Sequence, residues 1–233
     1  MTGPGTGATI VTGGTGGLGL GVVRALADAG HDVVVTWIAE REIERFPDDL
    51  RGRCRLEKTD VTSQESLEAL VRSCEPDGVW ALVQLVGGYL DDAPVAGMDM
   101  DGWDRQFALN TRTVALGLRA ALPGMVARGG GRAVAVGTRA ALRPFAGASA
   151  YAASKAAVLA LVTAASEEVK RSGVCVNAVL PSVIDTPANR AANPDADPAG
   201  WVRPDEIGAV IAFLCSAEAS AVTGAAIPVY GKA

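Results

Sequence analysis

The 233-residue sequence has few of the residues that build metal sites and histidine-based catalytic centres. It contains a single histidine, His31, and four cysteines that lie far apart in the chain. Without a Cys-x-x-Cys pair or a Cys/His cluster, the sequence argues against a zinc site and against a His-dependent triad. We expect the cysteines to be reduced and mostly buried, as in a cytoplasmic protein, and His31, which follows Gly30, to be a loop residue.

Features of nucleic-acid-binding and membrane proteins are also missing. No basic run occurs, the net charge is −5 and the isoelectric point is about 5.0, which argues against a nucleic-acid or anionic-membrane surface. The N-terminus lacks the charged segment and apolar stretch of a signal peptide. The longest apolar runs, such as 156–165, are too short to span a bilayer. These absences favour a cytoplasmic protein with a small-molecule partner.

What the chain does contain is a regular alternation of apolar runs and helical patterns. Its length and its 49% apolar content suit one globular domain over residues 1–233. The pattern predicts strands at 8–13, 32–37, within 53–61, 80–88, 131–137, 174–181 and 225–230, and helices at 17–30, 63–74, 100–127, 149–171 and 204–218. This is an α/β pattern, typical of a Rossmann-type, doubly wound parallel sheet of seven strands with helices on both faces. Segment 185–203 is too irregular for a helix or strand, so we expect a substrate loop there.

A glycine-rich stretch, TGGTGGLG at 12–19, joins the first strand to the first helix. Its glycines at 14, 16 and 19 satisfy the pattern G-x-G-x-x-G. Glycine permits a tight turn and a close approach of the backbone to a pyrophosphate, while the helix N-terminus offers free N–H groups and a partial positive charge. The stretch therefore predicts a dinucleotide site.

The second strand ends without the acidic residue that usually binds the ribose 2′-hydroxyl of NAD, because residues 36–38 are Thr-Trp-Ile. Thr36 could donate a hydrogen bond to a 2′-phosphate. Arg41 is the nearest cation, although it is equally well explained as the solvated start of a helix. NADP(H) is thus favoured over NAD(H).

A second motif, YAASK at 151–155, places Tyr151 and Lys155 one helical turn apart on one face. Asn110 lies in FALNTR, and Thr138 precedes Tyr151 by thirteen residues. Together with the glycine loop, these residues resemble the short-chain dehydrogenase/reductase family over essentially the whole chain. The resemblance implies an NAD(P)H-dependent carbonyl reductase or alcohol dehydrogenase.

The resemblance also implies a role for each residue. Tyr151 would donate a proton to a carbonyl oxygen as hydride arrives, and Lys155 would lower its pKa and bind the nicotinamide ribose. Thr138, where the family usually has Ser, would orient the substrate oxygen, and Asn110 would organise a proton relay through water. Asp60 would contact the adenine side of the cofactor, cap the following helix, or do both.

The resemblance implies further cofactor contacts at the positions that match the family's cofactor-binding residues. They fall on Gly13, Thr15, Gly17, Leu18, Gly19, Thr36, Trp37, Val61, Val86, Gly87, Pro181, Ser182, Ile184 and Thr186, beside Asp60, Tyr151 and Lys155. Thr186 matches a hydroxyl next to the nicotinamide carboxamide. Two motifs depart from the family: its Asn-Asn-Ala-Gly is Gln-Leu-Val-Gly at 84–87, and its Pro-Gly is Pro-Ser at 181–182. The first change removes asparagine contacts that tie down the fourth strand.

Loops at the carboxyl ends of the strands should form the substrate pocket. The candidate substrate residues are Tyr89, Arg139, Phe145, Asn189 and Trp201. Large aromatic groups suit a mainly apolar pocket. Arg139 and Arg190 could meet an anionic substituent, cap helices or lie in solvent.

Several alternatives stay open. Segment 180–201 locally resembles dihydropteridine reductases, so a pterin, a 3-oxoacyl thioester and another ketone are all possible substrates. A non-catalytic NADP-binding sensor or scaffold is the alternative of another class. The family resemblance further implies a homodimer or homotetramer built on the helices expected at 100–127 and 149–171.

Overall fold

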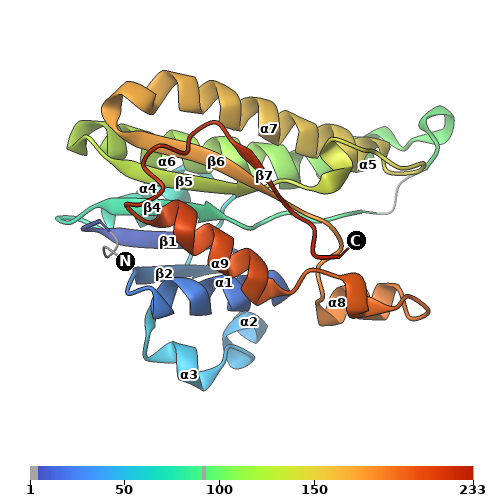
Figure 1. Ribbon diagram of the computed structural model, residues 1–233, viewed down its shortest axis with the longest axis horizontal. Helices are drawn as coiled ribbons and strands as arrows, with labels where there is room; N and C mark the ends of the chain where they lie inside the picture. Colours follow the sequence, from blue (N-terminus) through green and yellow to red (C-terminus); the bar gives the residue numbers. More distant parts are fainter. Residues whose placement is uncertain (1–4, 91–92, 233) are drawn as a thin grey trace.

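The computed structural model describes residues 5–90 and 93–232, and its centre is a parallel β-sheet of seven strands (Figure 1). The strands are β1 (Ala8–Thr12), β2 (Asp32–Trp37), β3 (Cys54–Lys58), β4 (Val79–Gln84), β5 (Gly131–Val136), β6 (Val174–Pro181) and β7 (Ala226–Val229). Their order is β3-β2-β1-β4-β5-β6-β7, and every neighbouring pair is parallel. The predicted fold class is therefore confirmed. The strand order reverses between β1 and β4, where such sheets bind ligands.

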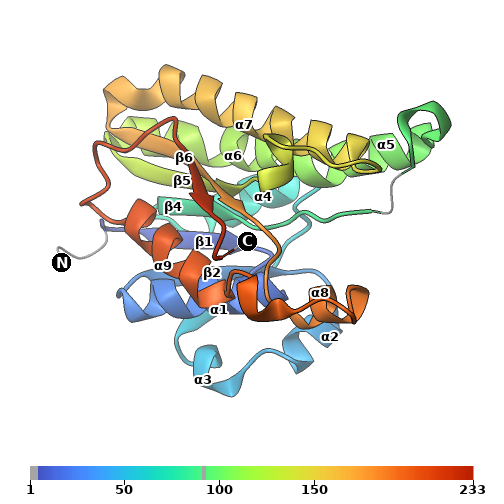
Figure 2. The same ribbon diagram turned by 45° about the vertical axis from the view of Figure 1, so that its right-hand side comes forward.

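Two layers of helices cover the sheet (Figures 1 and 2). Helices α1 (Gly17–Asp28) and α9 (Pro204–Cys215) pack together on one face, and α4 (Gln64–Arg72), α6 (Thr113–Arg128) and α7 (Ser149–Val169) cover the other. The continuously apolar sequence of strand β2 follows from burial on both faces. Val33 and Val35 belong to the core under α1, whereas Val34 belongs to the core under α4 and α6. A strand buried on both faces has no polar side to alternate with.

The structure adds short elements that the sequence pattern did not predict. Helices α2 (Glu40–Glu44) and α3 (Asp48–Arg51) lie between β2 and β3. The long helix expected at 100–127 is divided into α5 (Met100–Phe107), a π-helical turn (Ala108–Arg112) and α6. Single 3₁₀ turns span Val95–Gly97, Arg139–Ala141, Lys170–Ser172 and Pro198–Gly200.

The expectation that 185–203 has no regular element was wrong. Helix α8 (Pro187–Ala192) forms there because Thr186 caps its first turn through its side chain and Pro187 supplies a favourable first helical residue. The pair Thr-Pro is a recognisable helix start, so the signal was present in the sequence.

Helix α7 and the 3₁₀ turn after it, Ser149–Ser172, are long and apolar enough to meet the length and composition test for a membrane span. In the structure α7 packs along β6 and contacts α5 and α6, and it buries the charged residue Lys155. These contacts identify it as a core helix of the α/β fold.

The cysteines and the single histidine lie mostly in the interior of the fold. The four cysteines are unpaired, and only Cys54 is partly exposed. His31 lies in the loop between α1 and β2, as expected, but it is buried and its Nδ1 is 2.8 Å from Thr9 Oγ1. Burial lowers the pKa of His31 to about 4.

Candidate active site

A cavity of about 480 Å³ opens at the carboxyl ends of the central strands, next to the reversal of strand order. The glycine loop, the segment after β4, the end of β5, helix α7 and the segment after β6 all contribute to it. Most of the predicted residues meet there, namely Gly13, Thr15, Gly17, Leu18, Gly19, Val86, Gly87, Tyr89, Thr138, Tyr151, Lys155, Pro181, Ser182, Ile184, Thr186 and Asn189. The fold thus joins both sequence motifs in one cavity.

The glycine loop has the geometry of an anion-binding turn. Gly13 adopts a φ of +71°, which favours glycine, and a side chain at Gly19 would collide with the backbone of Gly13 and Gly14. Helix α1 starts after Gly16 with no side-chain cap and no acidic residue in its first turn. Its first N–H groups are therefore available to a pyrophosphate at the cavity.

Lys155 is only 4% exposed, and its position is determined by two elements. Its Nζ donates a 2.7 Å hydrogen bond to the carbonyl oxygen of Val136 at the end of β5. A Cβ atom added at Gly87 would lie 2.9 Å from that Nζ, so a larger residue at position 87 would require the Nζ to move. Burial lowers the pKa of Lys155 to about 8, which leaves the ammonium mostly charged at neutral pH.

Tyr151 faces the cavity among other side chains of the site. Burial raises the pKa of its phenol, and a hydrogen bond with the Thr138 side chain partly opposes that effect. The ring of Tyr89 meets the Tyr151 ring edge-on, with centroids 5.3 Å apart. Desolvation dominates this shift, and the predicted lowering of the Tyr151 pKa by Lys155 stays a prediction. The phenol therefore remains a proton donor at neutral pH.

Behind the cavity, Asn110 is fully buried in the π-helical turn and binds the backbone after β4. Its Nδ2 donates to Gly88 O and to Ser154 Oγ, both at 3.0 Å, and its Oδ1 accepts from Gly88 N at 2.9 Å. It does not line the cavity, so its predicted part in a water relay stays a prediction.

Gln106 is a residue of the site that sequence reasoning missed. It is 1% exposed; its Nε2 donates to Gly88 O at 2.5 Å, and its Oε1 accepts from Leu90 N at 3.0 Å. Gln106 and Asn110 thus hold the segment 88–90 that carries Tyr89. The sequence signal that could have indicated Gln106 is its spacing of four residues from Asn110, which places both amide side chains on one face of a helix.

Gln84, which stands where the family has its first Asn, also has a clear role. Its Nε2 donates to the carbonyl oxygens of Thr113 and Val114, both at 3.2 Å. These bonds tie β4 to the start of α6. A longer amide therefore anchors the strand despite the changed motif.

Four predicted cofactor residues, Thr36, Trp37, Asp60 and Val61, do not line the cavity. Thr36 is buried, and its Oγ1 accepts a 3.4 Å hydrogen bond from Gly13 N. Asp60 accepts from the backbone N and the Oγ1 of Thr62, while Ser63 is the residue that caps α4. The idea that Asp60 caps this helix was therefore wrong.

The predicted substrate residues divide into two groups. Tyr89 and Asn189 line the cavity, and Phe145 lies beside it with its ring centroid 6.3 Å from that of Tyr89. Arg139 lies outside the cavity lining, with its guanidinium 5.3 Å from the centroid of the Tyr230 ring. Trp201 lines a separate cavity of about 340 Å³, so the structure does not bring it to the cavity that contains Tyr151.

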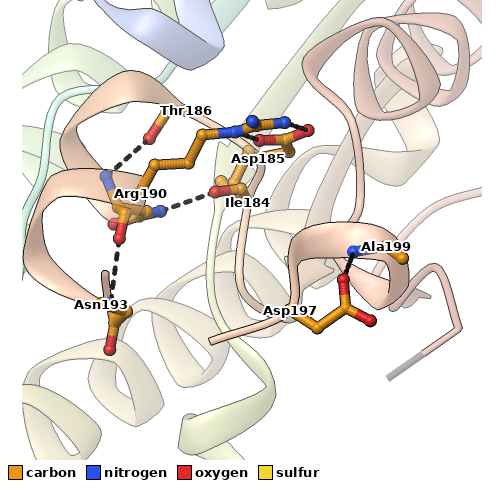
Figure 3. Close-up of polar contacts among 8 residues, drawn as sticks. Ile184, Asp185, Thr186, Arg190, Asn193, Asp197 and Ala199 are labelled. Atoms are coloured by element: carbon orange, nitrogen blue, oxygen red, sulfur yellow. Dashed lines mark hydrogen bonds and ion pairs between the residues drawn. The ribbon is translucent and has the colours of Figure 1, made fainter. Parts of the chain in front are cut away.

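The segment from Ile184 to Ala199 is held by its own polar contacts (Figure 3). Asp185 binds Arg190 through two hydrogen bonds, of 2.5 and 2.9 Å, so Arg190 already has an anionic partner. Asn189 donates from Nδ2 to Ile184 O at 2.8 Å, and its backbone N donates to the Thr186 hydroxyl at 3.2 Å. These contacts hold the segment together, and Ile184, Thr186 and Asn189 of it line the cavity.

Comparisons with known proteins cover nearly the whole chain. A family model described as enoyl-(acyl carrier protein) reductase matches residues 13–231. The chain is 35% identical to the cis-4-hydroxycyclohexanecarboxylate dehydrogenase of Sinomonas cyclohexanicum, over 95% of this chain and 94% of the relative. Among solved structures, a short chain dehydrogenase/reductase family protein superposes with a TM-score of 0.89 at 35% identity, covering 99% of this chain and 98% of the other. Actinorhodin polyketide ketoreductase with NADPH superposes with a TM-score of 0.87 at 28% identity, covering 97% and 96%.

Proposed function

Because the chain belongs to the short-chain dehydrogenase/reductase family and is an NAD(P)-dependent oxidoreductase that acts on a carbonyl or an alcohol, we propose that Tyr151 is its general acid and base. The observation that supports this most directly is one cavity lined by the glycine loop, Thr138, Tyr151 and Lys155. The free N–H groups of α1 and the glycine-only positions beside them suit a dinucleotide. A bound nicotinamide cofactor would supply or accept the hydride.

The protein would supply binding, orientation and the proton. In reduction, the protonated Tyr151 hydroxyl donates its proton to the carbonyl oxygen, and the Thr138 hydroxyl holds the same oxygen in place. The ammonium of Lys155, anchored on Val136 O, stabilises the phenolate that remains. In oxidation Tyr151 must first lose its proton, a step that burial of the phenol disfavours and the Lys155 ammonium favours.

For the substrate, we propose a ring-shaped ketone or secondary alcohol. Tyr89, Leu109 and Tyr151 contribute two aromatic rings and an aliphatic side chain to the cavity lining, and Phe145 extends the aromatic surface at Tyr89. The name of the Sinomonas relative describes a cyclohexane alcohol with a carboxylate. A 3-oxoacyl thioester and a pterin are the alternative substrates, and a non-catalytic nucleotide sensor is the alternative of another class.

Observations on the choice between NADP(H) and NAD(H) point in both directions. The missing acid at 36–38 favours NADP(H), and a structurally similar ketoreductase has NADPH bound. The fold, however, brings another acid to the glycine loop, because the Glu42 carboxylate accepts a hydrogen bond from the Thr15 hydroxyl.

We further propose a single domain over residues 1–233, a cytoplasmic location and a homodimer or homotetramer. The outer face of α7 exposes small residues such as Ala156 and Ala160, which would permit close helix packing. Light scattering coupled to size-exclusion chromatography measures the assembly directly.

The test of the function is Tyr151→Phe. We expect kcat to fall by about 10² or more in a panel of ring ketones, 3-oxoacyl thioesters and pterins, whereas cofactor affinity stays within twofold, because the variant removes only the proton donor. Unchanged turnover would refute the role of Tyr151. Cofactor binding by the wild type without turnover of any panel member would instead support the sensor.

A further inference from the structure

Glu42 lies on the short helix α2, yet its carboxylate reaches the glycine loop. Its Oε2 accepts a 2.7 Å hydrogen bond from the hydroxyl of Thr15, and its Oε1 accepts one of 3.2 Å from the backbone N of Ala39. The first contact joins residues 27 apart in the sequence. Two bonds in different directions thus fix a half-buried negative charge beside the loop.

The position of this charge matters because Thr15 also lines the cavity. In sheets of this type, a dinucleotide places its pyrophosphate on the N-terminus of the first helix, and its adenosine ribose lies toward the end of the second strand. An acid at that strand end binds the ribose 2′-hydroxyl. Residues 36–38 provide no such acid, but Glu42 brings a carboxylate from outside the strand to Thr15 of the glycine loop.

The nearby polar groups that the structure describes already have partners or lie in solvent. The buried hydroxyl of Thr36 already interacts with Gly13 N. Lys58, at the end of β3, is paired with Glu40 at 3.1 Å and lies over the Trp37 ring. Arg41, the cation next to Glu42 in the chain, is exposed to solvent, where its charge is screened.

From this arrangement we propose that Glu42 is a specificity-determining residue that selects NAD(H) over NADP(H). Its carboxylate would accept a hydrogen bond from a ribose hydroxyl, while it would repel the two negative charges of a 2′-phosphate. The inference rests on the proposed nicotinamide-dependent function and replaces the preference for NADP(H) that residues 36–38 suggested. In this proposal the acid that recognises the ribose lies on the helix after β2, hydrogen-bonded to Thr15, and not at the end of the strand.

The test compares the dissociation constants of NADH and NADPH, measured by fluorescence titration without any substrate. The variant is Glu42→Gln, which removes the charge. Its Oε1 can still accept from the Ala39 N–H, and its Nε2 can donate to the Thr15 hydroxyl, which is able to accept; glutamine also serves at this helix position. The matched control is Glu44→Gln, which makes the same charge change on an exposed residue of the same helix. Thermal melting of all three proteins checks that they are folded.

We expect the wild type to bind NADH at least tenfold more tightly than NADPH. Glu42→Gln should reduce that ratio at least tenfold, mainly through tighter NADPH binding, and Glu44→Gln should leave it within twofold. A wild-type preference for NADPH, an unchanged ratio in Glu42→Gln, or an equal change in Glu44→Gln would overturn the role of Glu42. If folded wild type binds neither nucleotide, the proposed function itself is wrong, and the inference is overturned with it.

Discussion

Replacing Gly87 by alanine should damage the active site through a single methyl group. The added Cβ would lie 2.7 Å from Asn110 Oδ1 and 2.9 Å from Lys155 Nζ, whereas ordinary van der Waals contact begins near 3.4 Å. Both polar atoms must then move by roughly half an ångström or more. Lys155 is buried and bonded to Val136 O, and Asn110 is buried and bonded to Gly88, so neither side chain can yield freely.

This displacement predicts two measurable effects. Because a shift of about 1 Å at a reacting group can cost about 10² in rate, kcat of Gly87→Ala should fall by one to two orders of magnitude. Overpacking should also destabilise the fold by about 1–3 kcal/mol. Steady-state kinetics, cofactor titration and urea unfolding measure the two effects separately.

The matched control is Gly52→Ala. Gly52 follows α3, has a φ of −83° that any residue adopts, and has no atom within 4 Å of an added Cβ. We expect this variant to retain wild-type kinetics and stability. If Gly87→Ala keeps kcat within threefold of the wild type, Lys155 is not held in place as the structure indicates, and the reasoning is refuted.

Two further predictions concern buried polar residues. His31 has a pKa of about 4 in the fold, against 6.5 in an unfolded chain, so the neutral ring contributes stability that is fully present above pH 6.5 and is lost as the pH falls toward 4. Urea unfolding should show a loss of at most about 3 kcal/mol over that interval, and His31→Gln should have a flatter pH dependence; equal slopes would count against the buried neutral ring. Gln106→Leu leaves Leu90 N–H unpaired and should cost about 1–3 kcal/mol of stability. If Gln106 also positions Tyr89, KM for the substrate should rise while cofactor affinity is unchanged; a lower melting temperature with an unchanged KM would show a purely structural role.

Much of the fold could be predicted because the sequence patterns that specify its strands, helices and glycine loop are local. Continuous apolar runs such as Val33–Val35 mark strands buried on both faces, and a glycine loop between a strand and a helix indicates a tight turn. The spacing of Tyr151 and Lys155 places both on one side of α7, and the cavity lining includes both. Periodicity and backbone preference act over a few residues, so the sequence displays them directly.

Contacts between distant segments could not be predicted in this way. Trp201 was expected in the substrate pocket, but it lines another cavity, and Arg190 is bound to Asp185 rather than free. Gln106 has no motif of its own and gains its place only because the segment after β4 passes beside α5. Side-chain partners depend on how loops pack, and loop packing leaves no periodic pattern in the sequence from which it could be predicted.

The sequence by itself determined the parallel sheet, the dinucleotide loop and the shared face of Tyr151 and Lys155, because each follows from spacing along one element. Only the tertiary structure decided the electrostatics of the site. Burial raises the pKa of Tyr151 and lowers that of Lys155, and α2 folds back to place the Glu42 carboxylate on Thr15. Charge and desolvation depend on every group that packs nearby, whatever its distance in the chain.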